Sequence, residues 1–243
     1  MSRPAQSSDA SLAPTGAAEA LLLAYRTGDD PAPLLATLAG YGDADLGRVR
    51  TDRRAALAFW CNLYNAGTQR LLAERPGLYE SRLRSLRFFR ATCVTVAGTP
   101  LGLDDIEHGI LRGRSKYGLG YLPRLLPGSF ERRYRLADPD PRIHFALNCG
   151  AESCPAIRAY TPGEVDDQLD LATRAYLDAT VEYDPDAGRV QVPRVMRWFR
   201  GDFGGRDGIY EFLRRHGAIP ADATPSIRYR SWDWSREAGK FAD

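Results

Sequence analysis

The sequence predicts an α+β fold in a single domain, and three observations support this prediction. Residues 52–74 form the strongest helical pattern in the chain, and their middle, 55–61, is apolar on every face, which is typical of a buried central helix. Short alternating segments separated by turn residues predict strands that pair as antiparallel hairpins. Helices and hairpins follow one another without the strand-helix-strand repeats of a parallel sheet. We therefore expect the central helix to pack on an antiparallel sheet.

The composition is that of an ordinary globular protein. With 243 residues, 44% of them hydrophobic and 26% charged, the chain can bury a stable core without disulfide bonds or a structural metal. Its net charge of +2 gives no reason to expect nucleic acid or a membrane as a partner, and no apolar stretch is long enough to cross a bilayer. The first fifteen residues lack the apolar core of a secretory signal, which predicts a cytoplasmic protein. In that compartment, four cysteines do not indicate a disulfide framework.

The domain organisation follows from the same patterns. Residues 1–15 are predicted to be a disordered leader and 16–50 a helical packing arm with helices at 17–27 and 31–39. The core domain is expected at 51–236, followed by a C-terminal tail at 237–243.

The central helix carries one polar stripe on an otherwise apolar surface. Asn62, Asn65 and Gln69 recur at helical spacing and therefore share a face. Buried amides must be hydrogen-bonded. The stripe either ties down the backbone of neighbouring segments or lines a site.

A hairpin and a second helix are expected after the central helix. Residues 91–96 alternate as a strand, Gly98-Thr99 forms a turn, and 101–103 returns. In the helix that follows, Asp104 is the expected N-cap and Glu107 the third-position acid of a capping box. The next residue, His108, points away from Ile106 and Ile110 if the helix repeats every ~3.6 residues. The pattern fits a solvent-exposed histidine and a functional one equally well.

Residues 112–135 form a long basic segment. It holds seven lysines or arginines against one acid, interleaved with aromatic residues and broken by glycine and proline. Such a composition can bind RNA, but it is more typical of a solvated loop. A loop of this length tends to be functional, and we expect a rim or lid over a pocket that favours an anionic substrate.

The remaining elements are read from cap and turn signals. Thr161 to Glu164 forms a capping box with proline at the first helical position, which predicts a helix to about Leu177. His216 lies in the last turn of a helix and receives no functional role. The other expected elements are a hairpin of 180–183 with 189–192, helices at 193–201 and 209–216, a strand at 226–229, and an aromatic cluster at 232–234.

The chemistry of the chain is concentrated in residues 143–155. The first six residues alternate as a strand that places His144 and Asn148 on one face. Cys149 follows, Gly150 ends the strand, and Cys154 with Pro155 is expected to start a short helix. A polar-faced strand that ends in a thiol, followed by a thiol at a helix start, is a common way to build a site.

Several blocks together resemble an uncharacterised family called domain of unknown function 547. They read FWCNLYNA at 59–66, IEHGILR at 106–112 and DPRIHFALNCG at 140–150 with SCP at 153–155, and closing blocks extend the resemblance to about 53–235. The family has no established activity to transfer. The resemblance implies that its pattern includes Asn62, Asn65, Glu107, His108, Arg142, His144, Cys149 and Cys154. Cys61 and Cys93 match no cysteine of the pattern and are interpreted as core thiols.

The first hypothesis for these residues is a cysteine-histidine hydrolase or an acyl or amide transferase that acts on a small-molecule or peptide-like substrate. A cysteine becomes nucleophilic when a helix start or a histidine lowers its pKa. Either Cys149 or Cys154 could be the nucleophile, and either His108 or His144 the base. In a strand, His144 and Cys149 would face opposite ways, which favours His108 as the base for Cys149. The orienting group would come from Asn62, Asn65, Asn148 or Glu107, and Arg142 and Asn148 would bind substrate. A papain-like or transglutaminase-like arrangement would suit this chemistry by analogy.

Two other hypotheses remain open. Cys149, Cys154, His108 and His144 could form a Cys₂His₂ zinc site, although the cysteine spacing is loose and no other cofactor is expected. Alternatively, the cysteine pair is structural and holds a loop of a binding or scaffold domain. The sequence does not indicate an oligomeric state.

Overall fold

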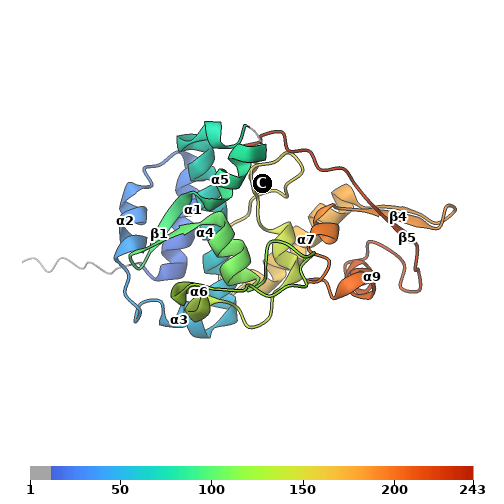
Figure 1. The fold of residues 1–243 in the computed structure, drawn as a ribbon, viewed down its shortest axis with the longest axis horizontal. Coiled ribbons are helices and arrows are strands. Elements are labelled where there is room, and N and C mark those ends of the chain that lie inside the picture. Colours follow the sequence, from blue (N-terminus) through green and yellow to red (C-terminus); the bar gives the residue numbers. More distant parts are fainter. Residues whose placement is uncertain (1–11, 81, 243) are drawn as a thin grey trace, which may run out of the picture.

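The computed structural model describes residues 12–80 and 82–242. Helix α4 (Arg53–Glu74) lies at the centre of the N-terminal half (Figure 1). The Asp52 carboxylate caps it by accepting hydrogen bonds from the backbone amides of Arg54 and Ala55. The helix is buried on every face from Ala55 to Gln69, as the apolar pattern predicts.

The N-terminal helices belong to the main core. They are α1 (Pro14–Thr27), α2 (Ala32–Gly40) and α3 (Gly47–Thr51), and α1 packs along α4 through Ala17, Ala18, Leu21 and Leu22. Small alanines on α1 let the two helix backbones approach closely. The predicted disordered leader mostly lies outside the described residues, and α1 begins at Pro14.

A two-stranded hairpin covers another face of α4. Strands β1 (Thr92–Val96) and β2 (Thr99–Gly102) are antiparallel, and the turn between them uses positive φ angles at Ala97 and Gly98. A Cβ atom at Gly67 would lie 2.6 Å from the Cys93 sulfur, so glycine in α4 permits the close contact with β1. The expected packing of the central helix on an antiparallel sheet is confirmed. Between α4 and β1 lie η1 (Pro76–Leu78) and α5 (Arg82–Arg90).

The helix after β2 corrects two predictions. Element η2 (Asp105–Leu111) is a π-helix, in which the Arg112 amide bonds the Glu107 carbonyl five residues earlier. His108 is only 3% exposed rather than solvated, because Arg112 and the Phe199 ring lie against it. The capping box is also wrong, because Asp104 itself has helical angles and makes no side-chain cap.

The C-terminal half holds a second core around a small sheet. Strands β3 (Glu182–Asp184) and β4 (Arg189–Val192) form the predicted hairpin, and β5 (Ser226–Tyr229) adds in parallel to β4. The helices around it are α7 (Val165–Thr180), α8 (Val195–Trp198) and α9 (Gly205–Arg215). Helix η3 (Pro141–Phe145) packs on α7, whereas α6 (Ser129–Tyr134) packs on η2 and α3 in the larger core. Helix α7 begins later than predicted, because the Thr161 amide bonds the Gln168 side chain instead of entering a capping box.

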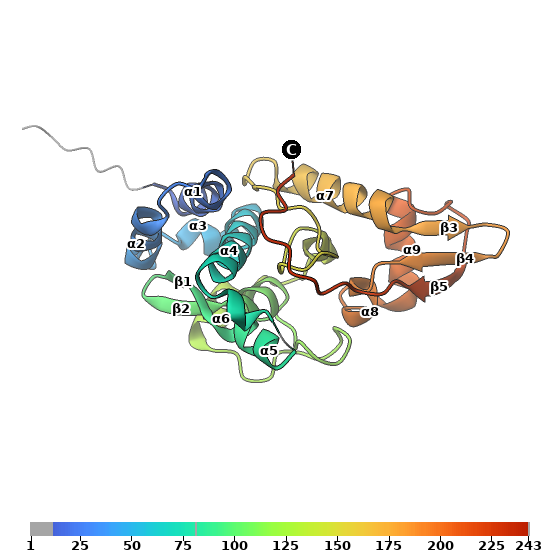
Figure 2. The same cartoon turned by 90° about the horizontal axis from the view of Figure 1, so that it is seen from above.

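The α+β prediction is therefore confirmed, with two hydrophobic clusters in one compact unit. The larger cluster surrounds α1 and α4, and the smaller lies between β3–β5, α8 and α9. In Figure 2 the C-terminal segment after β5 runs back across the molecule to the N-terminal end of α7. It bonds the 151–157 segment through bridges at Arg236 and Phe241, so the predicted tail is part of the fold. Among the described residues, no helix is both long and apolar enough to span a membrane.

Candidate functional site

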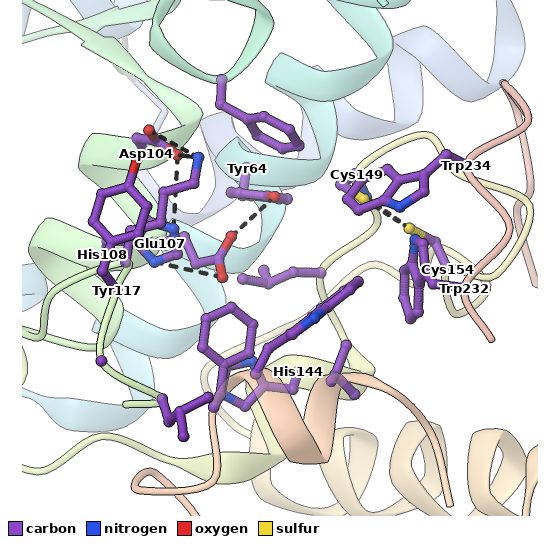
Figure 3. Close-up of a pocket in the computed structure, with 18 residues that line it drawn as sticks. Tyr64, Asp104, Glu107, His108, Tyr117, His144, Cys149, Cys154, Trp232 and Trp234 are labelled. Carbon is purple, nitrogen blue, oxygen red and sulfur yellow. Dashed lines mark hydrogen bonds and ion pairs between the residues drawn. The ribbon is translucent and has the colours of Figure 1, made fainter. Parts of the chain in front are cut away.

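A pocket of about 390 Å³ lies between the two hydrophobic clusters (Figure 3). Aromatic side chains dominate its wall, and the polar groups that reach it are few. Ligand sites commonly combine an apolar lining with a few placed polar groups. The lining residues are Tyr64, Phe89, Asp104, Glu107, His108, 116–119, His144, Leu147, Cys149, Cys154, Val195, Trp198, Phe199, Trp232 and Trp234.

The segment before the cysteines is not the predicted strand. Residues 141–145 form the short helix η3, whose start is capped when Asp140 accepts the Arg142 amide. The chain then extends along α4, where Asn65 donates to the Ala146 carbonyl and accepts from the Asn148 amide. A helix side chain thus supplies the hydrogen bonds that a neighbouring strand would have given. The helix expected at Cys154 is absent as well, since 154–160 is irregular backbone.

Asn148 and Gly150 build the turn that brings the two cysteines together. Asn148 accepts the Gly150 amide at 2.8 Å and donates to the Pro155 carbonyl at 2.7 Å, so one amide closes the loop at both ends. Gly150 has a φ of 86°, which a residue with a side chain rarely adopts. The Cys154 amide bonds the Ala151 carbonyl at 2.9 Å and completes the turn. Asn148 was expected to bind substrate, whereas here it is fully buried in this turn.

The two sulfurs form a hydrogen-bonded dithiol. They lie 3.0 Å apart, and the Cys149 amide donates to the Cys154 sulfur at 3.2 Å. Burial acts to raise the pKa of Cys154, but hydrogen bonds from the Cys149 thiol and from backbone amides outweigh it and lower that pKa. The hydrogen bond to Cys154 and burial both raise the pKa of Cys149. The pair therefore gives up its first proton from Cys154 and keeps the second on Cys149.

The C-terminal segment, residues 230–242, holds this loop from outside. The Ser153 hydroxyl accepts the Asp233 amide at 2.8 Å, and the Glu152 amide bonds the Ser235 carbonyl at 2.8 Å. The same segment brings Trp232 and Trp234 to the pocket, where both rings lie near Trp198 at centroid distances of 5.1 and 5.7 Å. Trp232 and Trp234 lie beside the dithiol (Figure 3), and Trp198 lines the same pocket.

Glu107 lines the pocket with its carboxyl group buried. Tyr64 donates a hydrogen bond to Glu107 Oε2 at 3.1 Å. Burial raises the pKa of Glu107, and the electrostatic interactions with Arg112 and His144 oppose this only in part. A carboxylic acid with a raised pKa in a cleft is suited to proton transfer near neutral pH.

His108 is held as a neutral ring. Arg112 Nη1 lies 2.8 Å from His108 Nδ1, and a guanidinium can only donate, so Nδ1 accepts and Nε2 carries the proton. Nε2 faces the Asp104 carboxylate at 3.6 Å. Burial, followed by the charge of Arg112, lowers the pKa of His108 well below its usual value. The lone pair on Nδ1, which a general base would use, therefore accepts a hydrogen bond from Arg112 in this structure.

His144 belongs to a buried charge network that joins the two halves of the chain. Its Nε2 lies 2.9 Å from Asp202 Oδ2, and Arg112 also donates to both oxygens of Asp202. The Phe199 ring stacks on His144 at 4.4 Å, and the Arg112 guanidinium lies 4.3 Å from the same ring. Hydrogen bonds from His144 and Arg112 lower the pKa of Asp202 although burial acts to raise it.

The structure separates other predicted site residues from the pocket. Asn62 bonds the backbone amide and carbonyl of Tyr160, so both central-helix asparagines tie down backbone rather than face the cavity. Arg142 is bound by the carboxylates of Asp140, Asp166 and Asp170. Cys61 and Cys93 are buried core thiols as predicted, and burial raises the pKa of Cys93 to about 12.

The basic segment does form one wall of the pocket, through residues 116–119. Its cations, however, are largely paired. Lys116 binds Asp104 and lies 4.6 Å from the Phe89 ring centroid, and Arg124 binds Glu131. These pairings weaken the basis on which an anionic substrate was expected.

The four residues of the zinc hypothesis are committed to other partners. The two sulfurs bond each other, while the histidines bond Arg112 and Asp202. Across residues 12–80 and 82–242, no group of three or more Cys, His, Asp and Glu side chains is arranged to hold a metal.

Sequence reasoning gave no site role to Tyr64, Asp202 or the tryptophans. Tyr64 had one usable signal, because a tyrosine in a fully buried helix needs a partner for its hydroxyl. Asp202 and its partner Arg112 are separated by 90 residues, and no local pattern connects them. The tryptophan cluster was recognised as aromatic but not as a pocket wall.

A model of the family described as a protein of unknown function, DUF547, matches residues 49–177. The chain belongs to this family. The match includes α4, Glu107, the histidines of the site and the dithiol, and it ends before Trp198, Asp202 and the C-terminal segment. No curated protein and no solved structure matches the chain.

Proposed function

We propose that this DUF547 protein is a thiol-dependent hydrolase or acyl or amide transferase whose reaction takes place in the pocket between the two clusters. The observation that carries the proposal is a dithiol with a lowered pKa on Cys154 that shares an apolar pocket with a protonatable Glu107. If these residues served only to fill the core, apolar side chains would be more favourable, because each of these polar groups is costly to bury.

Cys154 is the proposed nucleophile. Its thiolate receives the Cys149 amide and the Cys149 thiol proton, both of which stabilise negative charge on sulfur. In the first step the Cys154 sulfur bonds the carbonyl carbon of an ester, thioester or amide, and the bond to the leaving group breaks. An acyl-enzyme on Cys154 results.

Glu107 is the proposed proton carrier. In its neutral form it protonates the leaving group, and its carboxylate then takes a proton from the water or acceptor that attacks the acyl-enzyme. Attack by water releases an acid and regenerates the thiolate. Tyr64 orients the carboxyl group, and the Asp202–His144 pair stands beside it as the electrostatic support.

The pocket favours a substrate with a flat apolar group. Trp198, Trp232 and Trp234 offer ring faces, while the cationic Lys116 at the wall is neutralised by Asp104. Aromatic walls gain stabilisation from stacking in addition to burial. We therefore expect aromatic or long-chain acyl groups to be preferred over short polar ones.

The test is acylation by nitrophenyl esters of benzoic, octanoic and acetic acid, followed by mass spectrometry of the peptide that contains both cysteines. The wild-type protein should show an acyl group on Cys154, fastest with the apolar esters. Cys154→Ser should abolish the burst of nitrophenol, and Glu107→Gln should slow turnover at least tenfold.

Cys93→Ser is the matched control, because Cys93 is a buried thiol outside the pocket. It should acylate as the wild type does. If the wild-type protein takes up no acyl group, while Cys149→Ser and Cys154→Ser merely lower the melting temperature, the dithiol is structural and the enzyme proposal fails. One equivalent of zinc retained on purification would instead support the metal hypothesis.

A further inference from the structure

Six of the eleven large apolar side chains that are exposed among the described residues lie in one loop beside the pocket. Leu125 is 80% and Leu126 98% exposed, and they follow one another at the tip of the basic segment. Single exposed leucines are common, but adjacent, almost fully exposed leucines within a larger apolar set indicate an interaction surface. The set, here called the leucine loop, consists of Tyr117, Leu119, Tyr121, Leu122, Leu125 and Leu126.

The fold holds this loop in place. The Ser115 amide bonds the Leu122 carbonyl at 2.9 Å, and Gly201 donates to the Leu119 carbonyl at 2.7 Å. Arg124 is fixed by both carboxylate oxygens of Glu131 directly before the two leucines. Leu119 has a φ of 55°, a conformation that costs energy for a residue with a side chain. The exposure of the leucines is therefore imposed by the surrounding structure.

Exposed arginines flank the loop, although several cations of the basic segment are paired with acids. Residues 86–135 contain nine lysines and arginines against four acids, although the net charge of the whole chain is only +2. Exposed Arg90 of α5 shares a hollow with Leu125 and Leu126, and exposed Arg132 and Arg135 follow on and after α6. We expected no membrane partner from the net charge of the whole chain. That net charge does not reveal a local excess of positive charge.

We propose that the leucine loop docks on an anionic lipid surface. Leucines that protrude can insert between lipid headgroups, and flanking arginines are attracted to acidic lipids. A protein partner fits less well, because the hollow next to the leucines is lined mainly by charged and polar residues and offers no apolar pocket in return.

Docking in this way would place the pocket next to the lipid. Tyr117, Gly118 and Leu119 belong both to the basic segment and to the pocket wall, so the loop tip and the cavity are parts of one continuous structure. Lipid docking does not depend on the proposed thiol chemistry, and it is tested separately from it.

The experiment is co-sedimentation of the full chain with vesicles of phosphatidylcholine alone and of phosphatidylcholine mixed with phosphatidylserine. The wild-type protein should bind the mixed vesicles and bind less as salt rises, because added ions screen the arginines. Leu125→Ser combined with Leu126→Ser should weaken binding at least tenfold, since the apolar insertion is lost. Arg90→Glu combined with Arg132→Glu should weaken binding to the acidic vesicles specifically.

Leu23→Ser combined with Leu171→Ser is the matched control, because these leucines are 39% and 48% exposed and lie on α1 and α7. This variant should bind as the wild type does. Equal loss in both leucine pairs would overturn the proposal, as would wild-type binding that is absent or indifferent to phosphatidylserine. A wild-type dimer that the Leu125/Leu126 variant converts to a monomer, without vesicle binding, would make the loop a self-association surface and also overturn it.

Discussion

Asn65 makes the backbone hydrogen bonds that a neighbouring strand would otherwise make with residues 146–148, directly before the dithiol. Its amide donates to Ala146 and accepts from Asn148, while Asn62, one helical turn earlier, does the same for both backbone groups of Tyr160. Both asparagines are fully buried, so water cannot replace these hydrogen bonds. Of the two interpretations that the polar stripe allowed, the hydrogen bonds match the one in which it ties down backbone.

Asn65→Ala should therefore destabilise the protein by about 2–5 kcal/mol, because it leaves a buried carbonyl and a buried amide without partners. Urea denaturation followed by circular dichroism measures the loss. Thr37→Ala is a suitable control, since its hydroxyl bonds a carbonyl on an exposed helix surface. A loss in Asn65→Ala no greater than in the control would mean that the backbone of 146–148 finds other partners.

Glu107 should make the folded state less stable as pH rises. Burial raises its folded pKa above the ordinary glutamate pKa, so between these two pKa values the folded protein binds more protons than the unfolded chain. Stability contributed by the protonated group is thus fully present below the unfolded pKa and is lost as pH rises through the folded one. Glu107→Gln should flatten this part of the pH profile of the melting temperature.

His108 provides an internal comparison with the opposite sign. Its folded pKa lies well below 6.5, so the unfolded chain binds the extra proton and stability falls as pH decreases below that value. This acid-side loss should persist in Glu107→Gln. A variant whose whole profile matches the wild type would show that Glu107 titrates normally in the folded protein.

At the scale of elements, regular patterns were predicted well and irregular ones were not. The apolar stripe of 52–74 and the turn residues of both hairpins correctly placed α4, β1–β2 and β3–β4. The π-helix of η2 could not be read from an α-helical repeat. The burial of His108 was not predicted either, because it comes from contacts with Arg112 and Phe199 that helix periodicity does not reveal. The alternation of 143–148 suggested a strand with one apolar face, but all six residues are buried, so the alternation does not separate a buried face from an exposed one.

The dithiol loop depends on a glycine conformation. Gly150 has a φ of 86°, and a Cβ atom there would lie 2.8 Å from Leu72 Cδ1 in the core. Gly150→Ala should cost about 2–4 kcal/mol, from backbone strain together with overpacking. Gly188→Ala is the control that introduces backbone strain alone, because Gly188 has a φ of 57° and no atom lies within 4 Å of the added Cβ. This variant should cost only about 1 kcal/mol. Equal losses in the two variants, measured by thermal melting, would mean that Leu72 moves aside freely.

The site itself was predictable only where its residues are close in sequence. Cys149 and Cys154 were correctly grouped because one short loop joins them. The two histidines of the family pattern both line the pocket, but their hydrogen-bond partners, Arg112 and Asp202, were not predicted. Hydrogen bonds between residues far apart in the chain leave no periodic signal.

At the scale of the whole molecule, the pocket lies at the boundary between the two hydrophobic clusters, here called the seam. Tyr64, Leu147 and Cys154 line it from the larger cluster, and Val195 and Phe199 from the smaller one. The family match covers the first group and ends before the second. The shape of the pocket thus depends on whatever holds the two clusters together, and the buried network of Arg112, Asp202 and His144 crosses between them.

Asp202→Ala should destabilise the protein by about 3–5 kcal/mol, because the buried Arg112 charge is left without its carboxylate. Combining it with Arg112→Met should recover much of that loss, since removal of both charges leaves no unpaired ion.

The Trp60 fluorescence reports the larger cluster, and Trp198, Trp232 and Trp234 report the seam. If the network couples the clusters, unfolding of the wild type followed at these tryptophans will be a single transition, and Asp202→Ala will separate the seam from the core. A single transition of unchanged midpoint in Asp202→Ala would show that packing alone joins the two halves.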